Sequence, residues 1–262
     1  MTEEENDVFA NKPKANNFFI QLKRSFAITK KDLRIYYNKG PVVIQGILFP
    51  IVLFLAFTIG RNIQDKYVIS GLMSMVLFLT ATSIGPVVFP WETRQKTLER
   101  LIACPISIKT ILLGNIWSSF LFGSLFSIIP LVLGASVFQL WSSVRFLILV
   151  PAIIVAALAF SGFSLILSVP PTDMPANTMI LTIFIKFPVI FISPLFMPID
   201  ASSFVVISPL TYFLDIVNTS LGEASAFGSW GLLLDFGVLI AFGLIFGLLA
   251  FFLHGKTVHK RF

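Results

Sequence analysis

Long apolar runs are the feature of this 262-residue sequence that most restricts its fold. Inside a bilayer every backbone polar group must find its partner within the protein, so only helices and closed barrels can span the membrane. Continuous runs of about 18 or more apolar residues indicate transmembrane helices rather than barrel strands. Several such runs follow one another here, so we expect an all-α, multi-pass integral membrane protein.

The composition supports this class. Charged residues make up 12% of the chain and 29 phenylalanines stand against four tyrosines, whereas a soluble domain carries about 25% charged residues. One cysteine excludes an intrachain disulfide, and with two histidines it offers no metal-binding cluster unless carboxylates supply most of the ligands. The first forty residues are polar and basic, which predicts no cleavable signal peptide.

Six apolar segments are long enough to cross a bilayer, within a membrane domain over residues 41–254. Their expected bounds are Val42–Gly60, Val68–Phe89, Lys109–Phe138, Val144–Val169, Asn177–Met197 and Trp230–His254.

Basic residues orient these six spans. If both termini are cytoplasmic, inside segments hold eight lysines and arginines before the first span, four in residues 90–109 and three at the C-terminus. Outside segments then hold three, Arg61, Lys66 and Arg145. This bias follows the positive-inside rule, so we expect a plasma-membrane protein with cytoplasmic termini, including a C-terminal tail at 255–262. The net charge of +6 is explained by topology, and we expect no nucleic-acid partner.

The N-terminal region divides into a polar tail at 1–16 and a segment at 17–40 that predicts an amphipathic helix on the cytoplasmic membrane surface. Its apolar residues recur at steps of three and four, while its basic residues lie largely away from them. The expected stripe is Phe19, Leu22, Phe26, Leu33 and Tyr37. An ordinary basic linker beside the membrane is the alternative.

The segment 198–226, between the fifth and sixth expected spans, is too apolar for an ordinary loop and holds no lysine or arginine. Prolines interrupt it, so we expect short re-entrant or interfacial helices on the extracellular side. A seventh span over 201–222 is the alternative, but it would place the basic C-terminus outside, against the charge rule.

A charged segment, "ETRQKTLERLIAC" (residues 92–104), follows the second expected span. We expect a short amphipathic helix here, with an apolar face that needs a partner. Leu98, Leu101 and Ile102 form that face, and Glu92, Arg94 and Glu99 lie among its polar residues. A solvated loop whose leucines reach the lipid headgroups is the alternative.

Three motifs in order carry a family resemblance. Glu92 is followed by "KTLERL" at Lys96–Leu101 and by Pro105-Ile106-Ser107; "SPLFMPI" occupies Ser193–Ile199, and "PLTY" occupies Pro209–Tyr212. Over about residues 17–262 the chain resembles the ABC-2 type transporter permeases, in the group of drug-efflux and polysaccharide or nodulation-factor exporters. It departs from the family pattern at Lys96, where a glycine is usual.

The resemblance implies the membrane subunit of an exporter that moves a hydrophobic or lipid-linked substrate outward. Two permease copies, forming a homodimer in the bilayer, would sit on two copies of a separate ATPase subunit. No Gly-rich phosphate-binding loop occurs in this sequence, so Mg-ATP would bind the partner and this chain would need no cofactor and perform no catalysis. Residues 92–104 would be the coupling helix, with Glu92, Arg94, Leu98, Glu99, Leu101 and Ile102 touching the ATPase.

Lys186 is the one basic residue placed well inside an expected span. A lysine in the middle of a bilayer costs about 2.5–3.5 kcal/mol. It either contacts an anionic substrate group, pairs inside the bundle, or extends its ammonium to the cytoplasmic interface. An ATP-independent secondary transporter or channel is the alternative function; it would need intramembrane carboxylates or broken helices in both halves.

Overall fold

The computed structural model describes residues 18–36, 40–44, 48, 51–52, 55–56, 63–104, 106–171, 174–195, 198–200 and 204–257. All regular elements in these ranges are helices. The first expected span, Val42–Gly60, lies largely outside them, as do the tails at 1–16 and 258–262. The main helices are α2 (Phe18–Tyr36), α3 (Gly40–Val43), α5 (Asp65–Ala81), α6 (Ile84–Arg94), α7 (Thr97–Ala103), α8 (Ile108–Val137), α9 (Phe146–Leu167), α10 (Pro175–Ile192), α11 (Pro209–Ser220) and α12 (Gly231–Thr257). Two 3₁₀ turns, η2 (Trp141–Ser143) and η3 (Phe204–Ile207), complete the set.

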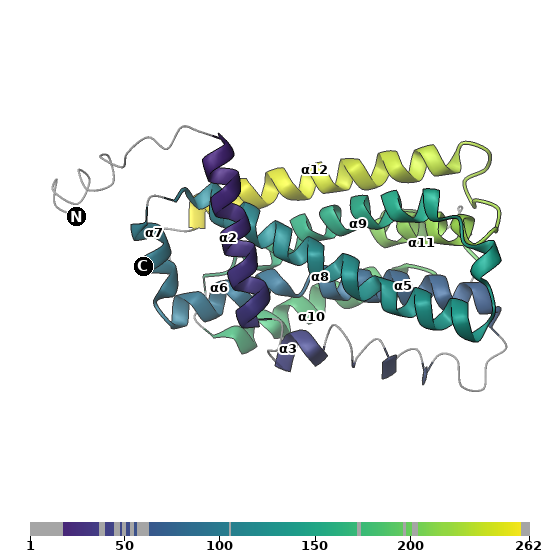
Figure 1. Cartoon of the computed structure of the whole chain (residues 1–262), viewed down its shortest axis with the longest axis horizontal. Helices are drawn as coiled ribbons and strands as arrows, with labels where there is room; N and C mark the ends of the chain where they lie inside the picture. The colour runs from purple at the N-terminus through teal and green to yellow at the C-terminus, as the bar shows by residue number, and fades with distance from the viewer. Residues whose placement is uncertain are drawn as a thin grey trace.

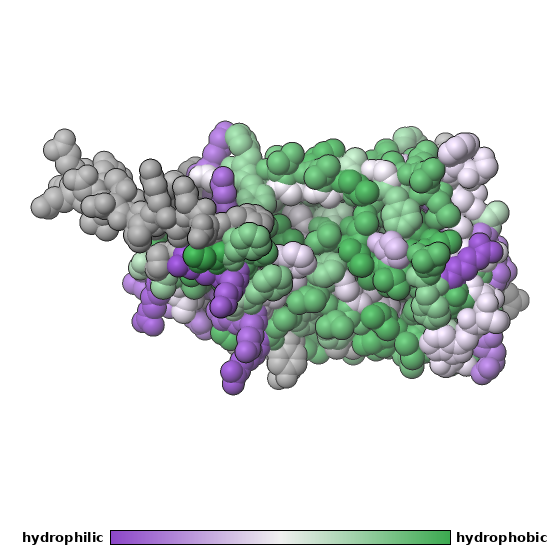
Figure 2. All heavy atoms as spheres, turned by 45° about the horizontal axis from the view of Figure 1, so that its top comes forward, coloured by the Kyte–Doolittle hydropathy of each residue, from purple (hydrophilic) through white to green (hydrophobic). Residues whose placement is uncertain are grey.

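Four helical segments are long and apolar enough to cross a membrane: Asp65–Arg94, Ile108–Val137, Phe146–Leu167 and Gly231–Thr257. They correspond to the second, third, fourth and sixth expected spans. The fifth corresponds to α10, whose apolar part, Ala176–Ile192, is shorter. The long helices run side by side, and a hydrophobic band covers the middle of the molecule between more hydrophilic ends (Figures 1 and 2). The chain is therefore a helical membrane protein.

The second span is divided at Thr82 and Ser83, between α5 and α6. The Thr82 hydroxyl donates to the Phe78 carbonyl at 2.6 Å, and the Ser83 hydroxyl donates to the Leu79 carbonyl. Hydroxyls that bond back to the preceding turn bend helices. This divided span is the most buried of the four, so its bend lies inside the bundle.

Glycine and alanine allow the long helices to pack closely, as is usual inside membranes. The α5–α8 and α9–α12 pairs make the most extensive contacts. A Cβ atom added at Gly123 of α8 would lie 2.7 Å from the Ala81 Cβ of α5. The helices therefore meet at van der Waals distance at this point.

All twelve residues of α11 are buried, and the helix packs against α5, α9 and α12. Ser208 caps its start by accepting a hydrogen bond from the Leu210 amide at 3.3 Å, and Pro209 follows at the first helical position. A helix of this length spans about 18 Å, less than the roughly 30 Å hydrocarbon core. α11 is thus a short buried helix and cannot be the alternative seventh span.

α2 crosses the long helices steeply at one end of the bundle, beside α7 and the end of α12 (Figure 1). Its buried face packs on α8 and consists of Ser25, Ile28, Thr29, Asp32 and Tyr36. Phe19 and Phe26 of the expected apolar stripe are exposed, at 81% and 48%. The face that α2 buries is therefore largely polar and lies beside the stripe that periodicity indicates.

The α6–α7 corner as a candidate coupling site

The expected helix over residues 92–104 is divided in the structure. α6 continues through Glu92 to Arg94, Gln95 and Lys96 form a turn, and α7 then runs from Thr97 to Ala103. We call residues 91–104 the α6–α7 corner. Because the chain turns sharply at this point, the corner projects from the end of one span and leads, after a short loop, into the next span, α8.

Lys96 makes the turn possible by adopting a left-handed backbone conformation, with φ of 54°. Its amide donates to the Thr93 carbonyl at 3.1 Å, and the Thr97 hydroxyl donates to the Glu92 carbonyl at 3.3 Å. These bonds satisfy carbonyls at the end of α6 that lack helical partners. Glycine is usual here in the family that the sequence resembles, and glycine adopts positive φ without a steric penalty.

We expect Lys96→Gly to stabilise the folded protein by about 0.5–1 kcal/mol. A left-handed residue with a Cβ costs the folded state roughly 1–2 kcal/mol, and glycine removes this cost. About half of the gain is offset, because the unfolded chain has more conformational freedom at a glycine. Denaturant unfolding in detergent micelles measures the change. Lys96→Ala is the control, because alanine keeps the strained Cβ; equal stability of the two variants would contradict the assignment.

The apolar face of α7 is turned toward its own chain. Leu98 is buried, with 3% of its surface exposed. Leu101 and Ile102 are half-buried against a cluster that includes Phe89 of α6 and Leu112 of α8. These three residues therefore fix α7 on the ends of the spans. The apolar face that the sequence pattern predicts thus has packing partners within the same chain.

The opposite side of the corner is charged and exposed. It consists of Arg94, Gln95, Lys96, Glu99 and Arg100. Three cations and one anion give this face a positive character. Long charged side chains on a short, rigidly seated helix present a surface that suits an acidic partner.

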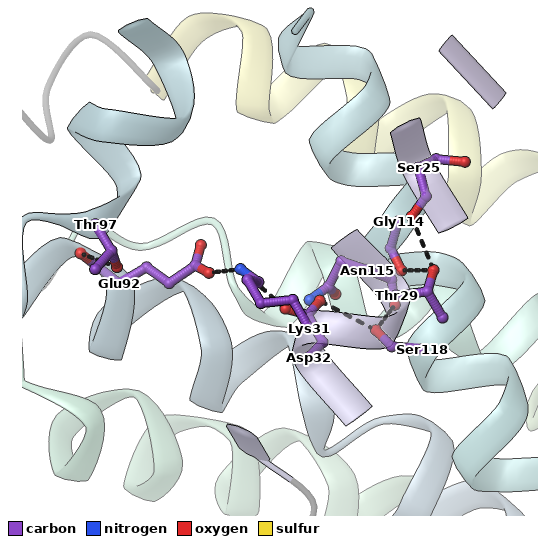
Figure 3. A network of polar contacts seen from close by, with 9 residues as sticks. All are labelled: Ser25, Thr29, Lys31, Asp32, Glu92, Thr97, Gly114, Asn115 and Ser118. Atoms are coloured by element: carbon purple, nitrogen blue, oxygen red, sulfur yellow. Dashed lines mark hydrogen bonds and ion pairs between the residues drawn. The ribbon is translucent and has the colours of Figure 1, made fainter. Parts of the chain in front are cut away.

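Glu92 belongs to neither side, because it points into the protein with only 2% of its surface exposed. It forms an ion pair with Lys31 of α2, and Lys31 forms a second ion pair with Asp32 at 3.1 Å (Figure 3). The Ser118 hydroxyl of α8 donates to Asp32 at 3.3 Å. This buried network, made of Lys31, Asp32, Glu92 and Ser118, joins three helices at the corner.

A second contact holds α2 on α8 next to the network. The Thr29 hydroxyl donates to the carbonyl of Gly114 at 3.0 Å (Figure 3). A Cβ at Gly114 would lie 2.7 Å from Ile28, so this glycine permits the close approach of the two helices. α2 is thereby attached to the start of α8.

Burial raises the pKa of Asp32 to about 7, although the Lys31 ammonium opposes the rise. The neighbouring Glu92 carboxylate adds to it. One cation thus serves two buried acids, which makes Lys31 the residue on which the network depends. Neither Lys31 nor Asp32 was singled out by the sequence pattern; the spacing of Ser25, Thr29 and Asp32 along one side of α2 is the signal that could have identified this face.

Lys186 lies away from the corner. Its side chain is 1% exposed, and its ammonium donates to the Ser83 hydroxyl at 3.3 Å. Ser83 lies at the bend between α5 and α6, where the negative end of the α5 dipole favours a cation. The structure therefore favours pairing inside the bundle over extension to the interface, and substrate contact stays a prediction.

Comparison with known proteins assigns a family to this arrangement. No individual curated protein matches the chain closely enough to be compared with it. The family model described as ABC-2 type transporter matches residues 16–221, a range that includes α2, the corner and α11. That match covers well over half of the sequence, and the chain therefore belongs to the ABC-2 type transporter family.

Proposed function

We propose that the chain is the permease subunit of an exporter, which moves a hydrophobic or lipid-linked substrate outward across the plasma membrane. ATP hydrolysis takes place on a separate ATPase subunit, which holds Mg-ATP and docks on the α6–α7 corner. Two permease copies with six spans each, both termini cytoplasmic, complete the assembly. The 198–226 segment covers its extracellular side and α2 lies at its cytoplasmic membrane surface.

The single observation that carries this proposal is the construction of the corner. Its inner face is anchored by Leu98 and its outer face is charged and exposed. A docking element that transmits force must be rigid on one side and accessible on the other. Arg94 and Glu99 thus become the expected ATPase contacts, while Leu98, Leu101, Ile102 and Glu92 hold the element in place.

The connections of the corner indicate how movement would travel. α6 leads directly into α5 through the bend at Ser83, and α8 begins at Ile108, a few residues after α7 ends. α2 is attached to both through the buried network. When the ATPases close, displacement of α7 would carry α6, α8 and α2 together, which is a rigid-body form of switching.

Reversing two neighbouring charges on the exposed face tests the docking. We expect Glu99→Lys combined with Arg100→Glu to weaken binding of the ATPase at least tenfold, about 1.4 kcal/mol. The double substitution exchanges the positions of one negative and one positive charge on the docking face, while the net charge of that face stays the same. Both side chains are exposed, so folding is preserved. The measurement is co-purification with the proposed ATPase subunit, together with the ATP hydrolysis rate of that subunit.

Arg145→Gln, an exposed change at the opposite end of the bundle, is the matched control and should bind normally. If the double reversal binds and stimulates the ATPase as the unaltered chain does, the corner is not the docking site. Substrate movement in vesicles without any ATPase would instead support the ATP-independent transporter or channel.

A further inference from the structure

The side of α2 that faces away from the bundle is a second surface, separate from the α6–α7 corner. We call it the exposed face of α2. It combines large apolar side chains with cations, as helices that lie in a membrane interface do. Its exposed members are Phe19, Ile20, Lys23, Phe26, Ala27, Lys30, Arg34 and Ile35.

Three cations form a row along the middle of this face. Lys23, Lys30 and Arg34 follow one another at steps of seven and four residues, which place side chains on one side of an α-helix. The one acidic residue of α2, Asp32, is buried and forms an ion pair with Lys31. Within α2, therefore, no negative charge offsets the row.

An aromatic edge runs beside the row, and a contact with α8 gives its direction. The ring of Phe26 stacks on the ring of Trp117, with centroids 5.5 Å apart and planes inclined at 28°. Trp117 lies nearly one turn further into α8 than Gly114, which meets Ile28 on the buried face of α2. The Phe26 edge therefore faces the membrane-spanning part of α8. Tryptophan is enriched at membrane–water interfaces, so this edge suits the boundary between headgroups and acyl chains.

The angle of α2 suits the same position. α2 crosses the long helices steeply at one end of the bundle (Figure 1). Because the long helices cross the bilayer, a helix at a steep angle to them lies close to the membrane plane. The aromatic edge then reaches the acyl boundary, and the long basic side chains extend their charged ends to the level of the lipid phosphates.

We propose that the exposed face of α2 binds anionic phospholipid headgroups of the cytoplasmic leaflet. Lys23, Lys30 and Arg34 contact the phosphates, and Phe19 and Phe26 enter the acyl boundary. The inference rests on the proposed position of α2 at the cytoplasmic membrane surface and on no property of the ATPase. That leaflet carries a negative surface potential, and each lysine or arginine near it strengthens attachment roughly fivefold. The buried network thus holds α2 from the side of the bundle, and anionic lipid holds it from the other side.

Native mass spectrometry of the purified full chain tests the proposal. The chain is placed in nanodiscs with equal amounts of phosphatidylcholine and phosphatidylglycerol that carry identical tails, and the lipids that it retains are counted. We expect phosphatidylglycerol to be retained in preference. Combining Lys23→Gln, Lys30→Gln and Arg34→Gln should lower that preference at least about tenfold. All three side chains are exposed, so folding is preserved. Lys23→Arg with Lys30→Arg and Arg34→Lys keeps every charge and should keep the preference.

The corner supplies the matched control. Arg94→Gln combined with Lys96→Gln and Arg100→Gln also removes three exposed cations. This variant should retain phosphatidylglycerol as the unaltered chain does, although its binding of the proposed ATPase should weaken. The lipid site and the docking site can therefore fail independently.

Hydrogen exchange of the α2 amides locates the effect. Exchange should be severalfold slower in the mixed nanodiscs than in phosphatidylcholine alone, because a helix held on the surface opens less often, and the three glutamine substitutions should remove the difference. The proposal is overturned if the glutamine variant retains phosphatidylglycerol as the unaltered chain does. It is equally overturned if inorganic phosphate, added to phosphatidylcholine nanodiscs, slows the exchange to the same degree, since the face would then bind free anions.

Discussion

Lys31→Met is expected to destabilise the protein by about 2–4 kcal/mol and to abolish stimulation of the proposed partner ATPase. Removing one member of a buried ion pair typically costs 3–5 kcal/mol, because the remaining charge stays uncompensated. Here Glu92 and Asp32 would both lose their cation. The estimate is reduced because 27% of the Lys31 side chain is exposed and water screens part of the loss.

A second substitution separates charge from packing. If the unpaired acids cause the loss, adding Glu92→Gln to Lys31→Met should recover at least half of the stability, since one buried negative charge is removed. Lys30→Met changes the adjacent, exposed lysine and should stay within about 0.5 kcal/mol of the unaltered protein. Unfolding in detergent micelles and ATPase assays of the complex give the two measurements; equal losses for Lys30→Met and Lys31→Met would contradict the role of the network.

The long apolar runs made most of the fold predictable. Four expected spans coincide with described helices to within a few residues, because burying the backbone in lipid leaves few alternatives to a helix. The polar face that α2 buries was not predictable in the same way. Periodicity identifies the most apolar stripe, whereas α2 buries Thr29 and Asp32. Burial of these polar side chains is favourable only because α8 and α6 supply their partners.

The corner itself could be located from the sequence, but its shape could not. Charge, a leucine stripe and the family resemblance all indicate residues 92–104. The division into α6 and α7 depends on the left-handed turn at Lys96, a residue with good helix propensity that gives no local signal for such a turn. The inward direction of Glu92 likewise depends on Lys31, sixty-one residues earlier.

Gly123→Leu is expected to cost about 3 kcal/mol or more and to uncouple the corner from the part of the bundle that contains α5. Gly123 of α8 faces Ala81, the last residue of α5 before the bend at Thr82 and Ser83. Even one added carbon would lie 2.7 Å from the Ala81 Cβ and 3.3 Å from its Cα. Neither atom can rotate away, so overpacking must separate the two helices.

The smallest version of this change isolates the contact. Gly123→Ala should destabilise by about 1–2 kcal/mol despite the better helix propensity of alanine, and Ala81→Gly in the same chain should restore most of the loss by removing the opposing methyl group. Gly237→Ala of α12, where nothing lies within 4 Å of the new carbon, should be neutral or slightly stabilising. Because Lys186 is hydrogen-bonded to Ser83 at this bend, a displaced α5 should also lower transport in reconstituted vesicles. Wild-type transport by a Gly123→Leu protein would show that α5 and α8 need not move as one body.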